Sequence, residues 1–409
     1  MYASNLGNAL RLRYDVTKDR GDLDEAIRLH RKALGATERG SADWAMYASN
    51  LGNALQTRYR ARGGQRDLEE AIRLHREALD ATERGSTNWA TLANNLGNAL
   101  QTRYRARGGQ RDLEEAIRLH REALDATERG SADWAMHASN LGNDFRLRYD
   151  VTKDRGDLDE AIRLHRKALG ATEPGSADWA GRANNLGNDL QTRYEATKDR
   201  ADLDETIRLH GEALDATEPG SADWAGRANN LGNDLQLRYE ATKHRGDLDE
   251  AIRLHGEALG ATERGSANWA MYANNLGNDY LTRYETTKDR ADLEEAIRLH
   301  IDALGATPRE SAVWATYANN LGTDLQTRYE AIGNRDDLDE AIRLHTEALG
   351  ATPRESADWA GRASNLGNDL RLRYDVTKDR GDLDEAIRLR SEALGATEPG
   401  SADWAGRAN

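Results

Sequence analysis

Residues 86–124 read STNWATLANNLGNALQTRYRARGGQRDLEEAIRLHREAL. The apolar side chains of the first half follow one another in steps of three or four residues. They are Trp89, Ala93, Leu96, Leu100 and Tyr104. This spacing is typical of one face of a helix of about four turns. Ser86 directly precedes it and belongs to the residue types that cap helix N-termini. We therefore expect a helix that begins near residue 86 and buries this apolar stripe.

The second half of the stretch predicts another helix. The segment RARGGQRD supplies a turn, and Asp112 followed by Glu115 resembles an N-cap pair at the start of the next helix. Six residues of this helix form its apolar stripe, namely Leu113, Ala116, Ile117, His120, Ala123 and Leu124. Gly97 interrupts the first stripe, where a missing side chain lets a neighbouring helix approach closely. The stretch therefore predicts a tightly packed pair of helices.

The same unit recurs along the whole chain. All nine tryptophans are spaced 45 residues apart, from Trp44 to Trp404, and residues 54–86 are identical to residues 99–131. A fixed period of this length indicates a repeat architecture. Because a helix pair cannot bury both of its apolar stripes alone, successive pairs must stack on one another. We expect an all-α solenoid over residues 1–409, with about nine helix pairs.

Composition excludes several classes of function. The 409 residues contain no cysteine, which rules out disulfide scaffolds, thiolate metal sites and a cysteine nucleophile. The net charge of −14 argues against binding to phosphate backbones or anionic lipid. No run of 18 apolar residues and no basic-then-apolar leader occurs, so the sequence predicts a cytoplasmic protein without membrane contact.

The repeat resembles the tetratricopeptide repeat. The pair Leu96 and Gly97, then Ala116, then Ala123 and Leu124 stand in the order which that family uses. The resemblance implies a right-handed α-solenoid of helix-turn-helix repeats that binds a protein or an extended peptide. The 45-residue unit is longer than the family's usual 34, and the NNLGN string is more similar to the kinesin-light-chain type. The repeat sequence is also similar to the tandem repeats of fungal and actinobacterial NLR-like and CHAT-domain proteins. This similarity implies an alternative role as a sensor or regulatory arm.

The resemblance also implies that the first helix of each unit lines a concave ligand-binding face. Its groove positions carry two rows of mostly asparagine, one turn apart. The first row is Ser49, Asn94, Ser139, Asn184, Asn229, Asn274, Asn319 and Ser364. The second row is Asn53, Asn98, Asn143, Asn188, Asn233, Asn278, Thr323 and Asn368. A carboxamide pairs with both backbone groups of an extended peptide, so we expect these rows to hold one. The alternative is that they only hydrogen-bond neighbouring helices.

Positions that differ between copies are candidates for ligand preference. One such position is the third residue after each tryptophan, which includes Arg182, Arg227, Tyr272 and Tyr317. Another lies one turn beyond the second asparagine row and includes Gln191 and Gln236. We hypothesise that these side chains select the ligand while the asparagines hold its backbone.

Reactive chemistry is not indicated. Eight histidines, from His30 to His345, occupy one equivalent position, but stacked units stand about 8–10 Å apart, too far for two of them to share a zinc ion. They are interpreted as packing residues. Arg58, Arg103 and their copies could form a basic stripe for RNA, which the acidic balance of the chain disfavours. Neither a phosphate-binding loop nor a nucleophile motif occurs, so the sequence predicts no catalytic residue, no cofactor and no metal.

Both ends of the sequence cut through a unit. Met1 aligns with Met46, and Asn409 follows Trp404 by only five residues, so neither end has a polar capping repeat. We expect a piece of a longer array whose uncovered ends can associate end to end.

Overall fold

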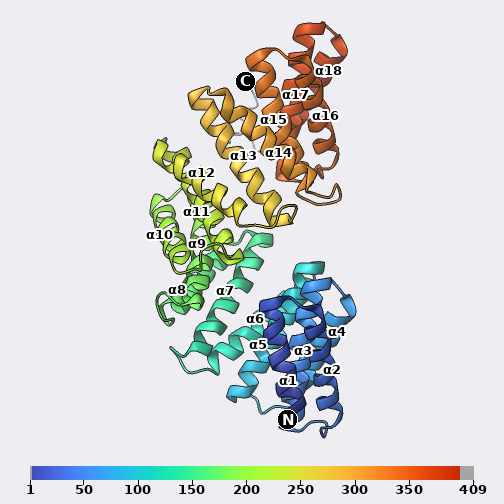
Figure 1. Ribbon diagram of the computed structural model, residues 1–409, viewed down its shortest axis with the longest axis vertical. Helices are drawn as coiled ribbons and strands as arrows, with labels where there is room; N and C mark the ends of the chain where they lie inside the picture. Colours follow the sequence, from blue (N-terminus) through green and yellow to red (C-terminus); the bar gives the residue numbers. More distant parts are fainter. Residues whose placement is uncertain (1, 397–409) are drawn as a thin grey trace. The chain divides into compact units, whose positions relative to one another are not determined.

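The computed structural model describes residues 2–396, and within them it is an all-helical α-solenoid with no strand (Figure 1). The helices come in antiparallel pairs, each odd-numbered helix followed by an even-numbered partner. Their bounds are α1 Tyr2–Thr17, α2 Arg20–Gly35, α3 Ala42–Arg62, α4 Gln65–Asp80, α5 Thr87–Arg107, α6 Gln110–Asp125, α7 Ala132–Thr152, α8 Arg155–Gly170, α9 Ala177–Thr197, α10 Arg200–Asp215, α11 Ala222–Thr242, α12 Arg245–Gly260, α13 Ala267–Thr287, α14 Arg290–Gly305, α15 Trp314–Ile332, α16 Arg335–Gly350, α17 Ala357–Thr377 and α18 Arg380–Gly395.

The start of the odd-numbered helices is confirmed. Ser86 is the N-cap of α5, and its hydroxyl oxygen accepts a hydrogen bond of 3.1 Å from the backbone N–H of Trp89. The helix continues three residues past Tyr104 and ends at Gly108, whose φ of 72° lies in the left-handed region that glycine adopts without strain. The stripe predicted from the spacing is buried, with Trp89 only 6% exposed and Leu100 fully covered.

The predicted N-cap of the even-numbered helices was wrong by three residues. Helix α6 begins at Gln110 behind Gly109, so Asp112 lies inside the first turn and does not cap the helix. Its carboxylate instead accepts two hydrogen bonds of 2.7 Å from the guanidinium of Arg103 on α5. An acidic residue in the first turn still suits the helix dipole, which is why the pattern resembled a cap.

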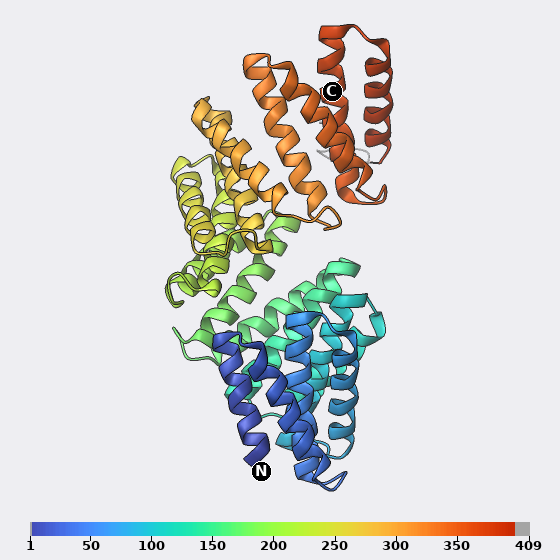
Figure 2. The same cartoon turned by 45° about the vertical axis from the view of Figure 1, so that its right-hand side comes forward.

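The helices form two compact units, Met1–Ala216 and Thr217–Asn409. Within each unit every pair packs against the next, and the odd-numbered helices lie beside one another, as the stacked hairpins of Figure 2 show. The core lies between the helices of each pair and between neighbouring pairs; in the first unit it combines Leu51, Leu68, Trp89 and Leu96 with many alanines. One continuous solenoid over 1–409 stays a prediction, and Trp404 lies outside the described residues.

Candidate functional site

Each repeat closes around a contact between glycine and histidine. A methyl group built on Gly97 would lie 2.4 Å from Nε2 of His120, closer than any real packing contact, and the same conflict recurs at Gly52 and Gly277. The close approach predicted from Gly97 is therefore confirmed. The histidine ring of the even-numbered helix fills the space that the glycine leaves, and His120 is fully buried.

The buried histidines also join one repeat to the next. His120 Nδ1 lies 2.5 Å from a carboxylate oxygen of Asp144 in the following repeat, while Nε2 lies 3.3 Å from the backbone carbonyl of Asn94 in its own repeat. The same carboxylate contact recurs in later repeats, as between His165 and Asp189, His255 and Asp279, His300 and Asp324, and His345 and Asp369. These side chains are structural, and among residues 2–396 no group of three His, Asp or Glu residues is arranged to hold a metal.

The first two repeats lack this carboxylate. Alanine stands at positions 54 and 99, where later copies carry the aspartate. His75 is consequently buried with no hydrogen bond at either ring nitrogen, and burial lowers its pKa to about 4. His30 has only a contact of 3.4 Å to the hydroxyl of Ser4, and its pKa is also lowered to about 4 by burial. Sequence reasoning missed this row, although the change from alanine to aspartate between copies was visible.

The first asparagine row lies in the seam between repeats rather than in an open groove. Asn94, Asn229 and Asn274 are 2%, 3% and 6% exposed, and Asn184 and Asn319 are half-buried. The Oδ1 atom of Asn94 already accepts a hydrogen bond of 2.8 Å from Asn140 of the next repeat. The three buried amides are inaccessible to a ligand in this conformation, so the expected peptide contact is corrected for them.

A third row of asparagines supplies the donors for this seam, and sequence reasoning had not separated it from its neighbours. Its Nδ2 groups reach back across one repeat, as in Asn275 to Asn229 at 2.8 Å and Asn320 to Asn274 at 2.9 Å. We call it the bridging row, and its members are Asn50, Asn95, Asn140, Asn185, Asn230, Asn275, Asn320 and Asn365. The NNLGN string therefore serves first to register one repeat on the next.

The second row is partly exposed along its length. Its members Asn98, Asn143, Asn188, Asn233 and Asn278 are all half-buried. The amides of Asn233 and Asn278 accept weak bonds of 3.3 Å from the bridging row, which leaves their N–H groups available.

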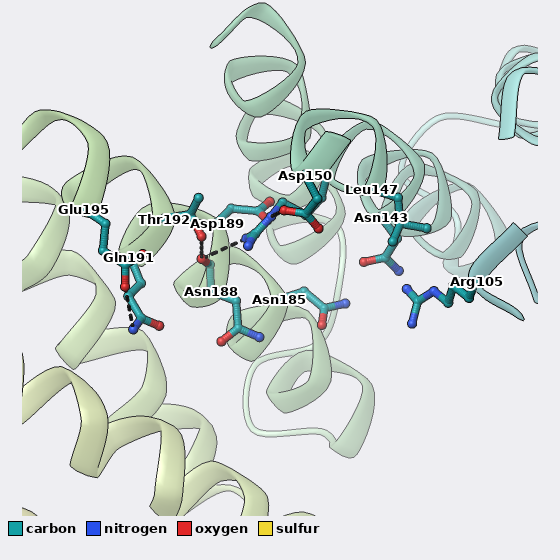
Figure 3. Close-up of a pocket in the computed structure, with 11 residues that line it drawn as sticks. Arg105, Asn143, Leu147, Asp150, Asn185, Asn188, Asp189, Gln191, Thr192 and Glu195 are labelled. Carbon is teal, nitrogen blue, oxygen red and sulfur yellow. Dashed lines mark hydrogen bonds and ion pairs between the residues drawn. The ribbon is translucent and has the colours of Figure 1, made fainter. Parts of the chain in front are cut away.

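In the first unit, Asn143 and Asn188 line a groove of about 640 Å³ between α5, α7 and α9 (Figure 3). The side-chain amides of these two residues make no hydrogen bond to another described residue. Apart from Leu147 the lining residues are polar or charged, and they include Arg105, Arg146, Asp150 and Glu195. The arrangement offers hydrogen-bond donors, hydrogen-bond acceptors and side chains of both charges to an extended polar ligand.

The residues predicted to select a ligand divide into two groups. Arg182, Tyr272 and Tyr317 are 8%, 3% and 6% exposed, and Arg227 is half-buried at the equivalent position. Arg182 donates to the hydroxyl of Thr172, and Tyr317 joins the apolar cluster around Trp269. Variation here adjusts packing between repeats, which corrects the prediction for the three buried side chains.

Gln191 and Gln236, by contrast, are only half-buried. Gln191 lines the groove and donates a bond of 3.3 Å to Glu195. The glutamine position therefore remains a candidate for ligand preference.

The arginine before each repeat tyrosine is occupied by ion pairs. Arg103 holds Asp112 within its own repeat and, at 2.8 Å, Glu69 of the preceding even-numbered helix. Arg148 and Arg193 pair with Asp157 and Asp202 in the same way. These guanidinium groups link neighbouring helices, and their carboxylate partners neutralise the basic stripe considered from the sequence.

Comparisons with known proteins agree with the repeat geometry. A sequence model described as "Tetratricopeptide repeat" matches eight segments, residues 1–40, 44–83, 89–129, 134–177, 179–219, 269–310, 314–357 and 359–402. No curated protein matches the sequence. Within residues 2–396, no helix has both the length and the apolar character needed to cross a membrane.

Several solved structures have a similar fold at low identity. BtubC (BKLC) from P. vanneervenii is 19% identical, with 65% of this chain and 93% of that chain covered and a TM-score of 0.39. PilF of Pseudomonas aeruginosa is 20% identical, with 66% and 97% covered and a TM-score of 0.44. A monomeric mutant of IFIT1 with Gppp-AAAA is 15% identical, with 96% and 80% covered and a TM-score of 0.46.

Proposed function

This chain belongs to the tetratricopeptide repeat family, and from that premise we propose that it is a non-catalytic scaffold which binds an extended peptide of a partner protein along its odd-numbered helices. The observation that carries the proposal is the pair of unengaged amides, Asn143 and Asn188, in the polar groove of the first unit. They stand at one position of successive repeats, so they can hydrogen-bond backbone groups a few residues apart in one extended peptide. Family membership supports the general role in protein interaction.

The proposal assigns different tasks to the two asparagine rows. The first and bridging rows hold neighbouring repeats in register, while the second row contacts the ligand. Gln191 lies on the same face as Asn188 and tunes the preference for ligand side chains. The cytoplasmic location stays a prediction from the sequence.

Replacing Asn143 and Asn188 together by alanine should weaken peptide binding about tenfold, because two net hydrogen bonds of about 0.7 kcal/mol each would be lost. The measurement is fluorescence polarisation on the intact chain with peptides selected from a random 12-residue displayed library. Stability should change little, since neither amide holds another helix.

Asn94→Ser is the matched control, because serine stands naturally at this position in Ser49 and Ser139, and the hydroxyl of Ser49 accepts the bridging bond from Asn95. This variant should bind the selected peptides as the parent does. Equal affinity of the parent and the Asn143→Ala, Asn188→Ala double variant would rule out the second row as the contact surface.

A role as the regulatory arm of an NLR-like or CHAT-type protein is the alternative function. It is tested by reading the coding sequence on both sides of residues 1–409 for such a domain. End-to-end self-association is tested by light scattering over a range of concentrations. A constant monomer mass would reject it.

A further inference from the structure

The ends of α3 and α5 carry six arginines, of which four are neutralised. Arg58 and Arg62 pair with Asp24, and Arg58 also holds Asp67. Arg103 and Arg107 pair with Glu69 in the same manner. Arg60 and Arg105 make no ion pair with any described residue, although nearby carboxylates are available to their neighbours.

The two unpaired guanidinium groups belong to neighbouring helices, and Arg105 lines the groove. Arg60 is exposed and reaches from α3 onto α5, where its Nη2 lies 3.5 Å from the hydroxyl of Thr102, one turn before Arg105. Partial burial, followed by repulsion from Arg105, lowers the pKa of Arg60. Two like charges without a counter-ion destabilise a surface slightly, so their presence is not explained by stability.

Other repeats carry the opposite charge at this position. Asp15, Asp150 and Glu195 occupy it in the other odd-numbered helices of the first unit. Arg105 lines the same groove as Asn143, Asn188 and the two acidic side chains at 150 and 195, as Figure 3 shows. Asp150 pairs with Arg146, which also lines the groove, at 3.1 Å, whereas Glu195 has no ion pair among the described residues. The groove is therefore basic at Arg105 on α5 and acidic at Glu195 on α9.

We propose that Arg60 and Arg105 form an anion subsite that binds the carboxylate side chains of an acidic segment in the bound peptide. The inference rests on the proposed peptide-binding function and adds which part of the bound peptide carries acidic side chains. Guanidinium groups bind carboxylates through charge-assisted hydrogen bonds, and the absence of an internal partner leaves these donors available. The acidic stretch lies over α3 and α5, and the rest of the peptide runs toward α7 and α9.

A nucleic acid fits this groove less well. Its phosphates would continue past Arg105 and meet Glu195, where like charges repel. A peptide can place acidic side chains at one end and neutral or basic ones at the other. The change of sign within one groove thus favours a peptide of uneven charge over a uniform polyanion.

The test exchanges the two arginines for the residues that other repeats already carry. Arg60→Asp together with Arg105→Glu restores the acidic character of this position, so the fold has precedent for both side chains. The matched control is Arg66→Asp with Arg111→Asp, which makes the same change of net charge at the start of α4 and α6. Both control residues are exposed, have no ion pair, and correspond to Asp336 in another copy.

Random 12-residue displayed peptides are selected on the intact parent and on both double variants at low salt. The parent and the control should enrich peptides with two or more Asp or Glu residues, and the groove variant should lose that enrichment. Synthetic peptides from the parent pool should bind the groove variant at least about tenfold more weakly and the control within about twofold. Replacing their acidic residues by Asn and Gln should produce the same loss on the parent.

The outcomes separate the two proposals. Peptides selected on the parent without acidic enrichment, or acidic peptides that bind the groove variant equally well, overturn the anion subsite and leave the scaffold function standing. Failure of the parent to select any peptide overturns both. Displacement of the acidic peptides by a 12-nucleotide single strand that itself binds the parent more tightly would overturn the peptide assignment in favour of nucleic acid.

Discussion

Gly277→Ala should lower the free energy of unfolding of the second unit by about 2 kcal/mol, even though alanine is the better helix former. The new methyl group would lie 2.6 Å from Nε2 of His300. The ring cannot move aside, because Nδ1 is held 2.5 Å from Asp324 and Nε2 is held 3.1 Å from the carbonyl of Asn274. Either α13 and α14 must separate or both contacts must break.

Urea unfolding of the intact chain measures this effect, and hydrogen exchange locates it in α13 and α14. Gly256→Ala is the matched control, since nothing lies within 4 Å of a methyl group there and the site is inside α12. That substitution should stabilise the chain by about 0.5–1 kcal/mol through helix propensity alone. If both variants gain stability, the ring does not fill the space beside the glycine as described.

Ala99→Asp should stabilise the first unit by about 1–3 kcal/mol near neutral pH, because it supplies the carboxylate that His75 lacks. Ala99 is fully buried and corresponds to Asp144, which receives bonds from both His120 and Gln101. The counterpart of that glutamine, Gln56, already lies on the same seam with its amide 2.9 Å from Thr102. The new side chain thus has two donors in place.

The acid sensitivity of the first unit should change as well. Burial lowers the pKa of His75 from 6.5 to about 4, so between these values the unfolded chain binds a proton that the folded chain refuses. Stability is therefore lost as the pH falls from 6.5 toward 4, by up to about 3 kcal/mol. A His–Asp pair already holds one proton when folded, so Ala99→Asp should flatten the pH profile in this window.

The reciprocal substitution is Asp144→Ala, which leaves His120 in the situation of His75. It should lower the free energy of unfolding by about 2 kcal/mol at pH 7 and add acid sensitivity between pH 6.5 and 4. Urea midpoints measured from pH 7 to pH 4 compare both variants with the parent. Unchanged midpoints in Asp144→Ala would show that the pair does not stabilise the seam.

The aspartates of the existing histidine–aspartate pairs also have shifted pKa values. Burial raises the pKa of Asp279, Asp324 and Asp369 above the usual value, although the contact with histidine lowers it in part. In each pair the histidine contacts the carboxylate through Nδ1 and a backbone carbonyl through Nε2, so both ring nitrogens have a partner. The seam is thus held by buried contacts rather than by exposed charge, and screening by salt affects it little.

The amino-acid sequence determined the helices, their pairing and the repeat. Apolar residues three and four apart can lie on one face only if the backbone is helical, and Ser86 at the start of that run fixes where the helix begins. Gly97 on the same face required a close neighbour, and the ring of His120 is that neighbour. These features depend on residues near one another in the chain, so the spacing alone was sufficient.

The tertiary structure decided which polar rows are buried and which are available. Asn94, Asn95 and Asn98 lie within about one turn of the helix, at the edge of the apolar stripe. A small rotation of the helix there would move a side chain from the seam between repeats into the groove. Only the stacking angle of the next repeat buries Asn94 and leaves Asn98 half exposed. Likewise, Arg105 is free because Arg103 and Arg107 occupy Glu69, a partner more than thirty residues away. Contacts between repeats depend on the packing of whole helices, which no local spacing specifies.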